Sequence, residues 1–164
     1  MFQRECDQEA SYIIESKKKC LELGLDSNNP KMPKNIMSEL ELGQKRDAYD
    51  EILEVVKFFS NKMIKLLEGT PVLITITDED GYLLDVLGDK SISETMSQFG
   101  VKPGIQFREE EMGTNVVSLT LKQNHPIQLI GSNHYHKCFQ DSACYGVPFH
   151  YSDDGNLLGS ICTV

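Results

Sequence analysis

Imidazole and thiol side chains near residue 140 have the clearest capacity for chemistry in this sequence. His134, His136 and Cys138 alternate along the chain, and Cys144 follows six residues later. Neutral imidazole and thiolate groups bind soft and borderline metals, and an extended segment places alternate residues on one face. Structural zinc sites usually carry paired cysteines at short spacing, and no second tight pair is present. These residues are candidate ligands, but the spacing does not predict a metal site.

A second candidate site is Gly113-Thr114-Asn115, which begins a helical pattern that continues to residue 123. The start of a helix leaves backbone N–H groups unpaired and carries partial positive charge, so a small anionic or hydroxylated ligand can dock there beside Thr114 and Asn115. In the structural alternative, Thr114 is an N-cap and Asn115 fastens a loop. Five residues, each equally suited to a protein core, would form the apolar walls of a pocket: Phe107, Met112, Val117, Tyr135 and Cys144.

Two long amphipathic helices are expected before these sites, over residues 6–23 and 45–67. Gly24 stands where a helix would end, and Pro30 and Pro33 prevent a helix from continuing through the connector. Apolar residues cover about half of the circumference of the second helix, which is more than one packing partner needs. The surplus predicts a further contact, either with a helix of another subunit or with the first helix of the same chain.

Strand-like runs follow at residues 72–77, 82–87, 105–108, 127–130, 144–151 and 157–164. Asp80-Gly81 and Asp154-Gly155 separate pairs of these runs, and an Asp-Gly turn between β-rich segments is a strong hairpin signal. A short helix is expected over 91–99 with Ser91 or Ser93 as its N-cap, and residues 109–111 are interpreted as a solvated charge run. The order predicts an α+β fold with an antiparallel sheet of five to six strands. The two early helices would cover one face, and the later helices and loops would close a pocket on the other.

The composition of the chain excludes several classes of function. The chain has 164 residues, which suits one domain with or without a helical arm. Its 16 basic and 25 acidic residues give a net charge of -9, so we expect no direct binding to nucleic acid. The apolar runs are too short to cross a membrane, and five unevenly spaced cysteines without a signal peptide predict cytosolic thiols.

Several ordered motifs resemble one known family. They comprise a basic-Cys stretch leading to Gly-Leu-Asp, a Thr-Asp-x-x-Gly hairpin followed by Gly-Asp, an aromatic-basic-Glu segment before Gly-Thr-Asn, and a Gly-x-x-His-Tyr segment before a strand that starts with Cys. The matching stretches are Lys19 to Asp26, Thr70-Pro71-Val72, Thr77 to Gly81, Gly88-Asp89, Phe107-Arg108-Glu109, Gly113-Thr114-Asn115, Gly131 to Tyr135, Cys144, Pro148 and Asp153-Asp154-Gly155. Together they resemble the GAF sensor domain of sigma-54-dependent transcriptional activators, in particular the regulators of acetoin and dihydroxyacetone operons.

The resemblance implies a GAF-like fold, related to PAS domains, in a fragment of a longer regulator. Residues 1–44 would form the helical arm with its connector, and residues 45–164 the sensor domain. Such a domain is cytoplasmic, forms a homodimer through helices, and binds a small-molecule effector or a regulatory protein. It controls an ATPase module and a DNA-binding domain, both absent here, and this chain contains no phosphate-binding loop of its own.

The chain also departs from the family pattern. Phe107 stands where the family commonly has Trp, Val116-Val117-Ser118 replaces small residues with Gly, and Tyr145-Gly146-Val147 replaces small polar residues and Ala. Larger side chains facing a pocket change its volume. The identity of the effector and of any cofactor therefore cannot be inferred from the resemblance.

We do not expect an enzyme, although two alternatives remain open. Some GAF-fold proteins resemble methionine sulfoxide reductases, in which one thiolate attacks and a second thiol resolves the product, and Cys138 and Cys144 could take those parts. No basic residue other than Lys137 and the nearby histidines is placed to lower a thiol pKa. The second alternative is a haem or iron group on His134 or His136.

Overall fold

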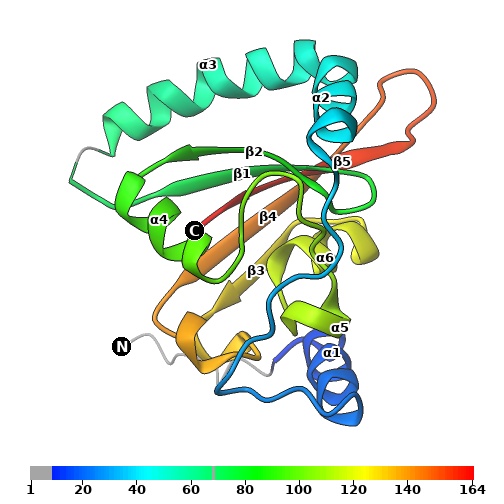
Figure 1. Cartoon of the computed structure of the whole chain (residues 1–164), viewed down its shortest axis with the longest axis vertical. Coiled ribbons are helices and arrows are strands. Elements are labelled where there is room, and N and C mark those ends of the chain that lie inside the picture. Colours follow the sequence, from blue (N-terminus) through cyan, green and yellow to red (C-terminus); the bar gives the residue numbers. More distant parts are fainter. Residues whose placement is uncertain (1–8, 68) are drawn as a thin grey trace, which may run out of the picture.

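A five-stranded antiparallel sheet forms the centre of the computed structural model, which describes residues 9–67 and 69–164 (Figure 1). The strand order is β2-β1-β5-β4-β3, and every neighbouring pair is antiparallel. The strands are β1 (Leu73–Asp78), β2 (Leu83–Gly88), β3 (Ile127–Ile130), β4 (Ala143–His150) and β5 (Leu157–Thr163). The predicted α+β class with a central antiparallel sheet is confirmed.

Helices lie on both sides of this sheet. Figure 1 shows α2 and α3 above it and α1, α5 and α6 below it, with α4 beside the β1–β2 end. The helices are α1 (Ser11–Glu22), α2 (Glu39–Ala48), α3 (Asp50–Leu66), α4 (Lys90–Gln98), α5 (Glu109–Met112) and α6 (Val116–Gln123), with short 3-10 turns η1 (Gly131–Asn133) and η2 (Lys137–Phe139). Within the described residues, none of these helices is both long and apolar enough to cross a membrane.

Each face of the sheet carries its own apolar cluster. On the α2 and α3 side, Tyr49 and Leu53 pack with Ile76, Leu84 and Leu158. On the other side, a larger cluster joins α1, α6 and the sheet, and its members include Ile13, Phe107, Val117, Leu119, Leu129, Cys144 and Cys162. All six residues of β1 are buried, because helices cover both of its faces.

The first helix does not lie where the sequence analysis placed it. Its predicted range of 6–23 begins outside the described residues, and the described part, α1, packs against α5 on the face opposite α3. The expectation that both early helices share one face is therefore wrong, as is the idea that the first helix covers the surplus apolar side of the second. Val55, Phe58, Phe59 and Leu66 of α3 stay more than half exposed in this chain. A contact with another subunit remains a prediction.

The predicted helix over 45–67 is two helices in the structure. Ser38 begins α2 with a capping box: its hydroxyl accepts from the Glu41 N–H, and the Glu41 carboxylate accepts from the Ser38 N–H. Tyr49 separates α2 from α3, and it is held in the core because its hydroxyl donates to the Leu158 carbonyl at 2.7 Å. The chain turns at the residue that anchors both helices to β5.

Three local expectations also differ from the structure. Residues 105–108 form isolated bridges with Ile36 and Tyr82 and no regular strand, so the sheet has five strands. Helix α4 begins at Lys90, because the Asp89 carboxylate accepts from the N–H groups of Ser91 and Ile92. Residues 109–111 belong to α5 and are not a solvated charge run, since Glu109 is buried.

Two glycine positions give opposite predictions for the same substitution. A Cβ atom at Gly159 of β5 would lie 1.9 Å from the backbone oxygen of Thr77, so Gly159→Ala must push β1 and β5 apart and should lower the free energy of unfolding by about 3 kcal/mol. A Cβ atom at Gly43 of α2 would meet no other atom within 4 Å, and Gly43→Ala should raise that free energy by about 1 kcal/mol through helix propensity. Urea unfolding followed by circular dichroism measures both. Equal effects of the two substitutions would contradict the packing described for Gly159.

Candidate functional site

A cavity of about 220 Å³ lies between the sheet, α4, α6 and the segment around η2. Six of the seven residues predicted for a ligand site line it: Phe107, Met112, Thr114, Asn115, Val117 and Cys144. The remaining lining residues are Thr75, Ile92, Thr95, Met96, Phe99, Val116, His134, Cys138, Phe139, Ser142 and Val164. The surface of the cavity is largely apolar, and its described lining contains no Asp, Glu, Lys or Arg.

Tyr135 is the predicted wall residue that does not line the cavity. Its ring packs with Cys20 and Leu25, and its hydroxyl donates to the Leu25 carbonyl at 2.6 Å. The side chain therefore fastens the segment after η1 to the end of α1. Its neighbours at positions 134 and 136 are also buried, so burial in this segment does not by itself distinguish cavity residues from packing residues.

The start of α6 reverses the capping roles that the sequence suggested. Asn115 is the N-cap: its side-chain oxygen accepts from the Ser118 N–H at 2.9 Å, and its amide group donates to the Gly113 carbonyl at 2.9 Å. Thr114 is buried and its hydroxyl lies 2.8 Å from that of Ser16 in α1. Both side chains therefore have protein partners at the edge of the cavity.

A buried imidazole and thiol form a pair in the cavity wall. His134 Nε2 lies 3.2 Å from Cys144 Sγ, and His134 Nδ1 lies 3.1 Å from the Gly131 carbonyl oxygen. A carbonyl oxygen can only accept, so the imidazole proton is on Nδ1 and the thiol donates to Nε2. Burial lowers the pKa of His134 and raises the pKa of Cys144. The pair is therefore neutral, and its thiol is not activated as a nucleophile.

The other candidate metal ligands do not join this pair. His136 is buried next to Gly113 outside the cavity lining, and neither of its ring nitrogens makes a well-formed hydrogen bond. Cys138 lines the cavity and is otherwise exposed. Among the residues that the structure describes, no three His, Cys, Asp or Glu side chains are grouped so that they could hold a metal ion.

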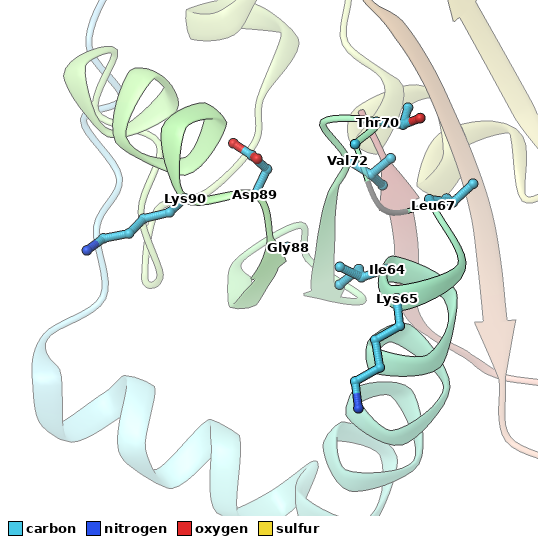
Figure 2. Close-up of a pocket in the computed structure, with 9 residues that line it drawn as sticks. Ile64, Lys65, Leu67, Thr70, Val72, Gly88, Asp89 and Lys90 are labelled. Atoms are coloured by element: carbon cyan, nitrogen blue, oxygen red, sulfur yellow. The ribbon is translucent and has the colours of Figure 1, made fainter.

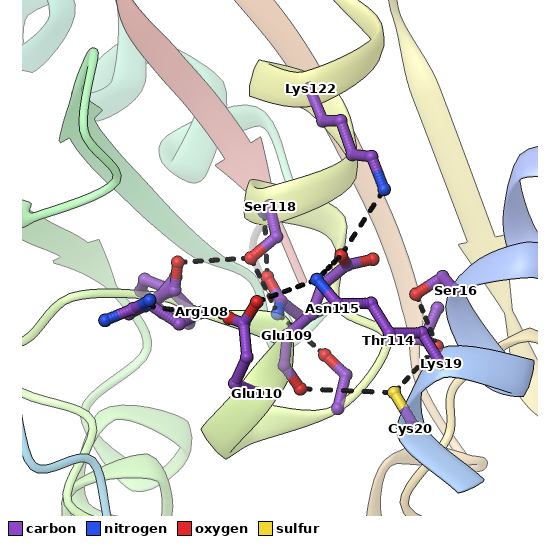
Figure 3. Close-up of polar contacts among 12 residues, drawn as sticks. Ser16, Lys19, Cys20, Arg108, Glu109, Glu110, Thr114, Asn115, Ser118 and Lys122 are labelled. Carbon is purple, nitrogen blue, oxygen red and sulfur yellow. Dashed lines mark hydrogen bonds and ion pairs between the residues drawn. The ribbon is translucent and has the colours of Figure 1, made fainter. Parts of the chain in front are cut away.

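Polar contacts join the cavity wall to α1, as Figure 3 shows. Besides the hydrogen bond between Thr114 and Ser16, Cys20 Sγ lies 3.8 Å from Thr114 Oγ1. The buried carboxylate of Glu109 lies 3.5 Å from Lys19 Nζ and 3.6 Å from Lys122 Nζ, so it links α1 to α6 across α5. Both neutral and charged contacts thus attach α1 to residues 109–115, the segment that precedes α6 and contributes to the cavity wall.

Sequence reasoning missed the contribution of α4 to this cavity. Ile92 and Met96 of α4 and Phe99 at its C-cap line the cavity, although no residue of α4 is fully buried. The ring of Phe99 meets that of Phe139 edge to face, with 5.8 Å between the ring centroids. The spacing of Ile92, Met96 and Phe99 by four and three residues is the signal that could have identified them, because it places all three on one face of a helix that is otherwise polar.

A second hollow, of about 660 Å³, lies between the end of α3 and the start of α4 (Figure 2). Lys65, Asp89 and Lys90 are its charged lining residues, and their side chains point away from one another. The Asp89 carboxylate is committed to capping α4. This hollow therefore lacks the convergent polar groups that a specific site requires.

Comparison with known proteins agrees with the resemblance seen in the motifs. The chain is 26% identical over 149 residues to a signal-transduction and transcriptional-control protein of Clostridium beijerinckii. The aligned residues are 91% of this chain and 23% of that protein. It is 25% identical over 97 residues to the glycerol metabolism operon regulatory protein of Citrobacter freundii, and these residues are 59% of this chain and 15% of that protein. The chain is similar to bacterial transcription regulators.

The chain spans less than a quarter of the length of either relative. Its fold matches a chain in the crystal structure of the E. coli DhaR(N)–DhaL complex with a TM-score of 0.84 at 18% identity, covering 94% of this chain and 51% of the other. No protein-family model matches the sequence. The predicted resemblance to regulators and the predicted fold are confirmed.

Burial of the two histidines predicts how stability depends on pH. Burial lowers the pKa of His134 and of His136 below the ordinary value of 6.5, so the folded chain binds fewer protons than the unfolded chain as the pH falls through 6.5. Their contribution to stability is therefore complete above that pH and declines below it, by up to about 1.4 kcal/mol per pH unit for each histidine. Urea unfolding between pH 7.5 and 5 should show a shallower loss in His134→Gln/His136→Gln than in the original chain. An unchanged slope would contradict this assignment.

Proposed function

We propose that this chain is the effector-sensing region of a longer transcription regulator, and that its cavity binds a small metabolite. The observation that carries the proposal is the position of Thr114, which lines the cavity and is hydrogen-bonded to Ser16 of α1. An effector that displaces the Thr114 side chain acts on a contact that holds a helix in place. Phe107, Met112, Asn115, Val117 and Cys144 complete the proposed binding site.

Transmission of the signal then follows from differential binding. An effector shifts a regulator only if it binds one arrangement of the protein more tightly than another. Here the two arrangements are α1 attached to the loop at Thr114 and Glu109, and α1 released from it. The ion pairs of Glu109 with Lys19 and Lys122 favour the attached arrangement, because they compensate a carboxylate that is otherwise buried.

The remaining regulator would lie outside this chain. By resemblance to the GAF domains of sigma-54-dependent activators, we propose that it contains an ATPase module and a DNA-binding domain, and that the whole protein acts in the cytoplasm. We also propose the division into an arm of residues 1–44 and a sensor of residues 45–164. Residue 44 lies within α2, so the two parts share a helix.

A protein partner is the second candidate signal, and α3 supports it. Phe58, Phe59 and Leu66 of α3 have exposed apolar side chains in this chain. Such a surface suits a helix of a second copy in a homodimer or a regulatory protein. The related DhaR(N) chain was crystallised as a complex with DhaL, which supports a protein partner for this fold.

We propose a regulatory role without catalysis. Desolvation raises the pKa of all four cysteine thiols in the described residues, Cys20, Cys138, Cys144 and Cys162, and a thiol with a raised pKa is a poor nucleophile. Turnover of free methionine sulfoxide with a thiol reductant would overturn this proposal in favour of a reductase that uses Cys138 and Cys144.

Filling the cavity tests the sensing proposal. A panel of small metabolites should contain a compound that raises the melting temperature of the original chain, because a ligand that binds only the folded state stabilises it. Ile92→Phe places a larger side chain in the cavity and should abolish that shift, whereas Val147→Phe, at an exposed position of β4, should keep it. A shift that survives Ile92→Phe would place the binding site elsewhere. The absence of any shift would favour the protein-partner version.

Removing the Ser16 hydroxyl tests the route to α1. Ser16→Ala deletes the hydrogen bond to Thr114 and should lower the free energy of unfolding by about 1 kcal/mol, with effector affinity kept within a few fold. Hydrogen exchange should then show that the effector no longer changes the protection of α1 amides. Ser11→Ala, at the exposed first residue of the same helix, should leave the response intact. Equal responses in both variants would exclude this contact from the route.

A further inference from the structure

We infer that the cavity takes a small uncharged molecule with a largely hydrocarbon surface, about the size of a substituted benzene. This inference rests on the proposed function, since it names the chemical class of the effector. Of the two ligand types expected at the start of α6, anionic or hydroxylated, it excludes the anionic one. The reasons lie in the charge, the committed polar groups and the volume of the cavity.

Charge is the first constraint. The described lining contains no Lys or Arg to neutralise an anion and no Asp or Glu to neutralise a cation. Burial lowers the pKa of His134, the one titratable imidazole in the wall, so it is uncharged near neutral pH. A charged group that leaves water without a partner loses its hydration and gains little in return. Three phenylalanine rings offer a cation only the weaker attraction of their faces.

The Asn115 side chain at the start of α6 has no donor left for an anion. The Asn115 side chain occupies the Ser118 N–H, and both hydrogens of its amide group are used, one toward the Gly113 carbonyl and one toward the Ser118 hydroxyl at 3.0 Å. Beyond this cap, α6 faces the cavity with the hydrocarbon side chains of Val116 and Val117. An anion would therefore meet an occupied cap and two methyl-bearing side chains.

Other polar side chains in the wall donate to the protein as well. The Ser142 hydroxyl donates to the Phe139 carbonyl at 2.7 Å, the Thr95 hydroxyl to the Ser91 carbonyl at 2.9 Å, and the Cys144 thiol to His134. Their hydrogens are committed, but the hydroxyl oxygens keep lone pairs that can accept. A ligand with one hydroxyl donor can thus be accommodated, whereas a carboxylate finds no free donor among these groups.

Volume sets the size. A dry apolar cavity of about 150 Å³ holds one benzene molecule, so 220 Å³ corresponds to about nine non-hydrogen atoms. The walls include five large aromatic and thioether side chains: Phe99, Phe107, Phe139, Met96 and Met112. Both side-chain types make favourable contacts with an aromatic ring. A benzene ring that carries a short hydroxyalkyl chain meets all three constraints.

Three compounds with one skeleton test the inference: 2-phenylethanol, phenylacetate and 2-phenylethylammonium. They share a ring and a two-carbon chain and differ in charge, so size is nearly constant. Titrated into the isotope-labelled chain at pH 7.5 and followed by NMR, 2-phenylethanol should shift the signals of Val117 and Cys144 and bind at least tenfold more tightly than either ion. The shifts should disappear in Ile92→Phe and persist in Val147→Phe.

Xenon separates failure of the ligand class from failure of the sensing proposal. If xenon perturbs the cavity signals but phenylacetate or 2-phenylethylammonium binds as tightly as 2-phenylethanol, the uncharged class is wrong and the sensing proposal stands. The uncharged class is equally wrong if xenon enters and none of the three compounds binds. If xenon does not enter either, the cavity is closed to small molecules, and the small-molecule version of the proposed function fails with it.

Discussion

The close approach of α6 to strand β4 is the constraint on which the rest of the structure depends. A Cβ atom at Gly146 would lie 2.2 Å from the Thr120 hydroxyl and 2.9 Å from a Val116 methyl group, so only glycine allows this distance. Thr120 in the middle of α6 and Val116 in its first turn both lie at this point of β4, and Val116 lines the cavity together with Thr75 of β1 and Val164. The contact at Gly146 therefore sets the position of the helix whose first turn lines the cavity.

The buried carboxylate of Glu109 in α5, shortly before α6, is a second constraint on the structure. Glu109 is buried in the turn that leads to the cavity, and a buried carboxylate is tolerated only with partners. Lys19 and Lys122 supply them from α1 and α6, while Glu110 shares Lys19 at 2.7 Å. Since the partners come from different helices, the positions of the loop, of α1 and of α6 depend on one another. The hydrogen bond between Ser16 and Thr114 joins α1 to the same segment before α6 (Figure 3).

Local signals in the sequence predicted the helices, strands and turns better than they predicted the contacts between them. The hairpin turns were recognisable from their Asp-Gly pairs, because such a turn needs a residue with positive φ. Gly81 and Gly155 both adopt positive φ in the structure. The start of α2 was also encoded locally, in the capping box of Ser38 with Glu41, but the apolar pattern of residues 45–67 obscured both this start and the break at Tyr49. The bond between Ser16 and Thr114 spans 98 positions, and no periodicity reveals such a pairing. The partnership of His134 with Cys144 depends on how the η1 and η2 segment folds back on β4, which a loop sequence does not specify.

The cavity wall contacts α1 directly on one face of the sheet, whereas its connection to α3 on the other face is indirect. On the cavity side, one hydrogen bond separates a wall residue from α1. On the other side, α3 packs on β2, while Tyr49 at its start is hydrogen-bonded to the Leu158 carbonyl of β5, so strands of the sheet lie between the cavity and α3. A strand hydrogen-bonded to neighbours on both sides resists displacement, because any shift breaks two ladders at once. Under the proposed function, an effector in the cavity would therefore act on α1 at lower energetic cost than on α3, and the exposed apolar residues of α3 would be left for association.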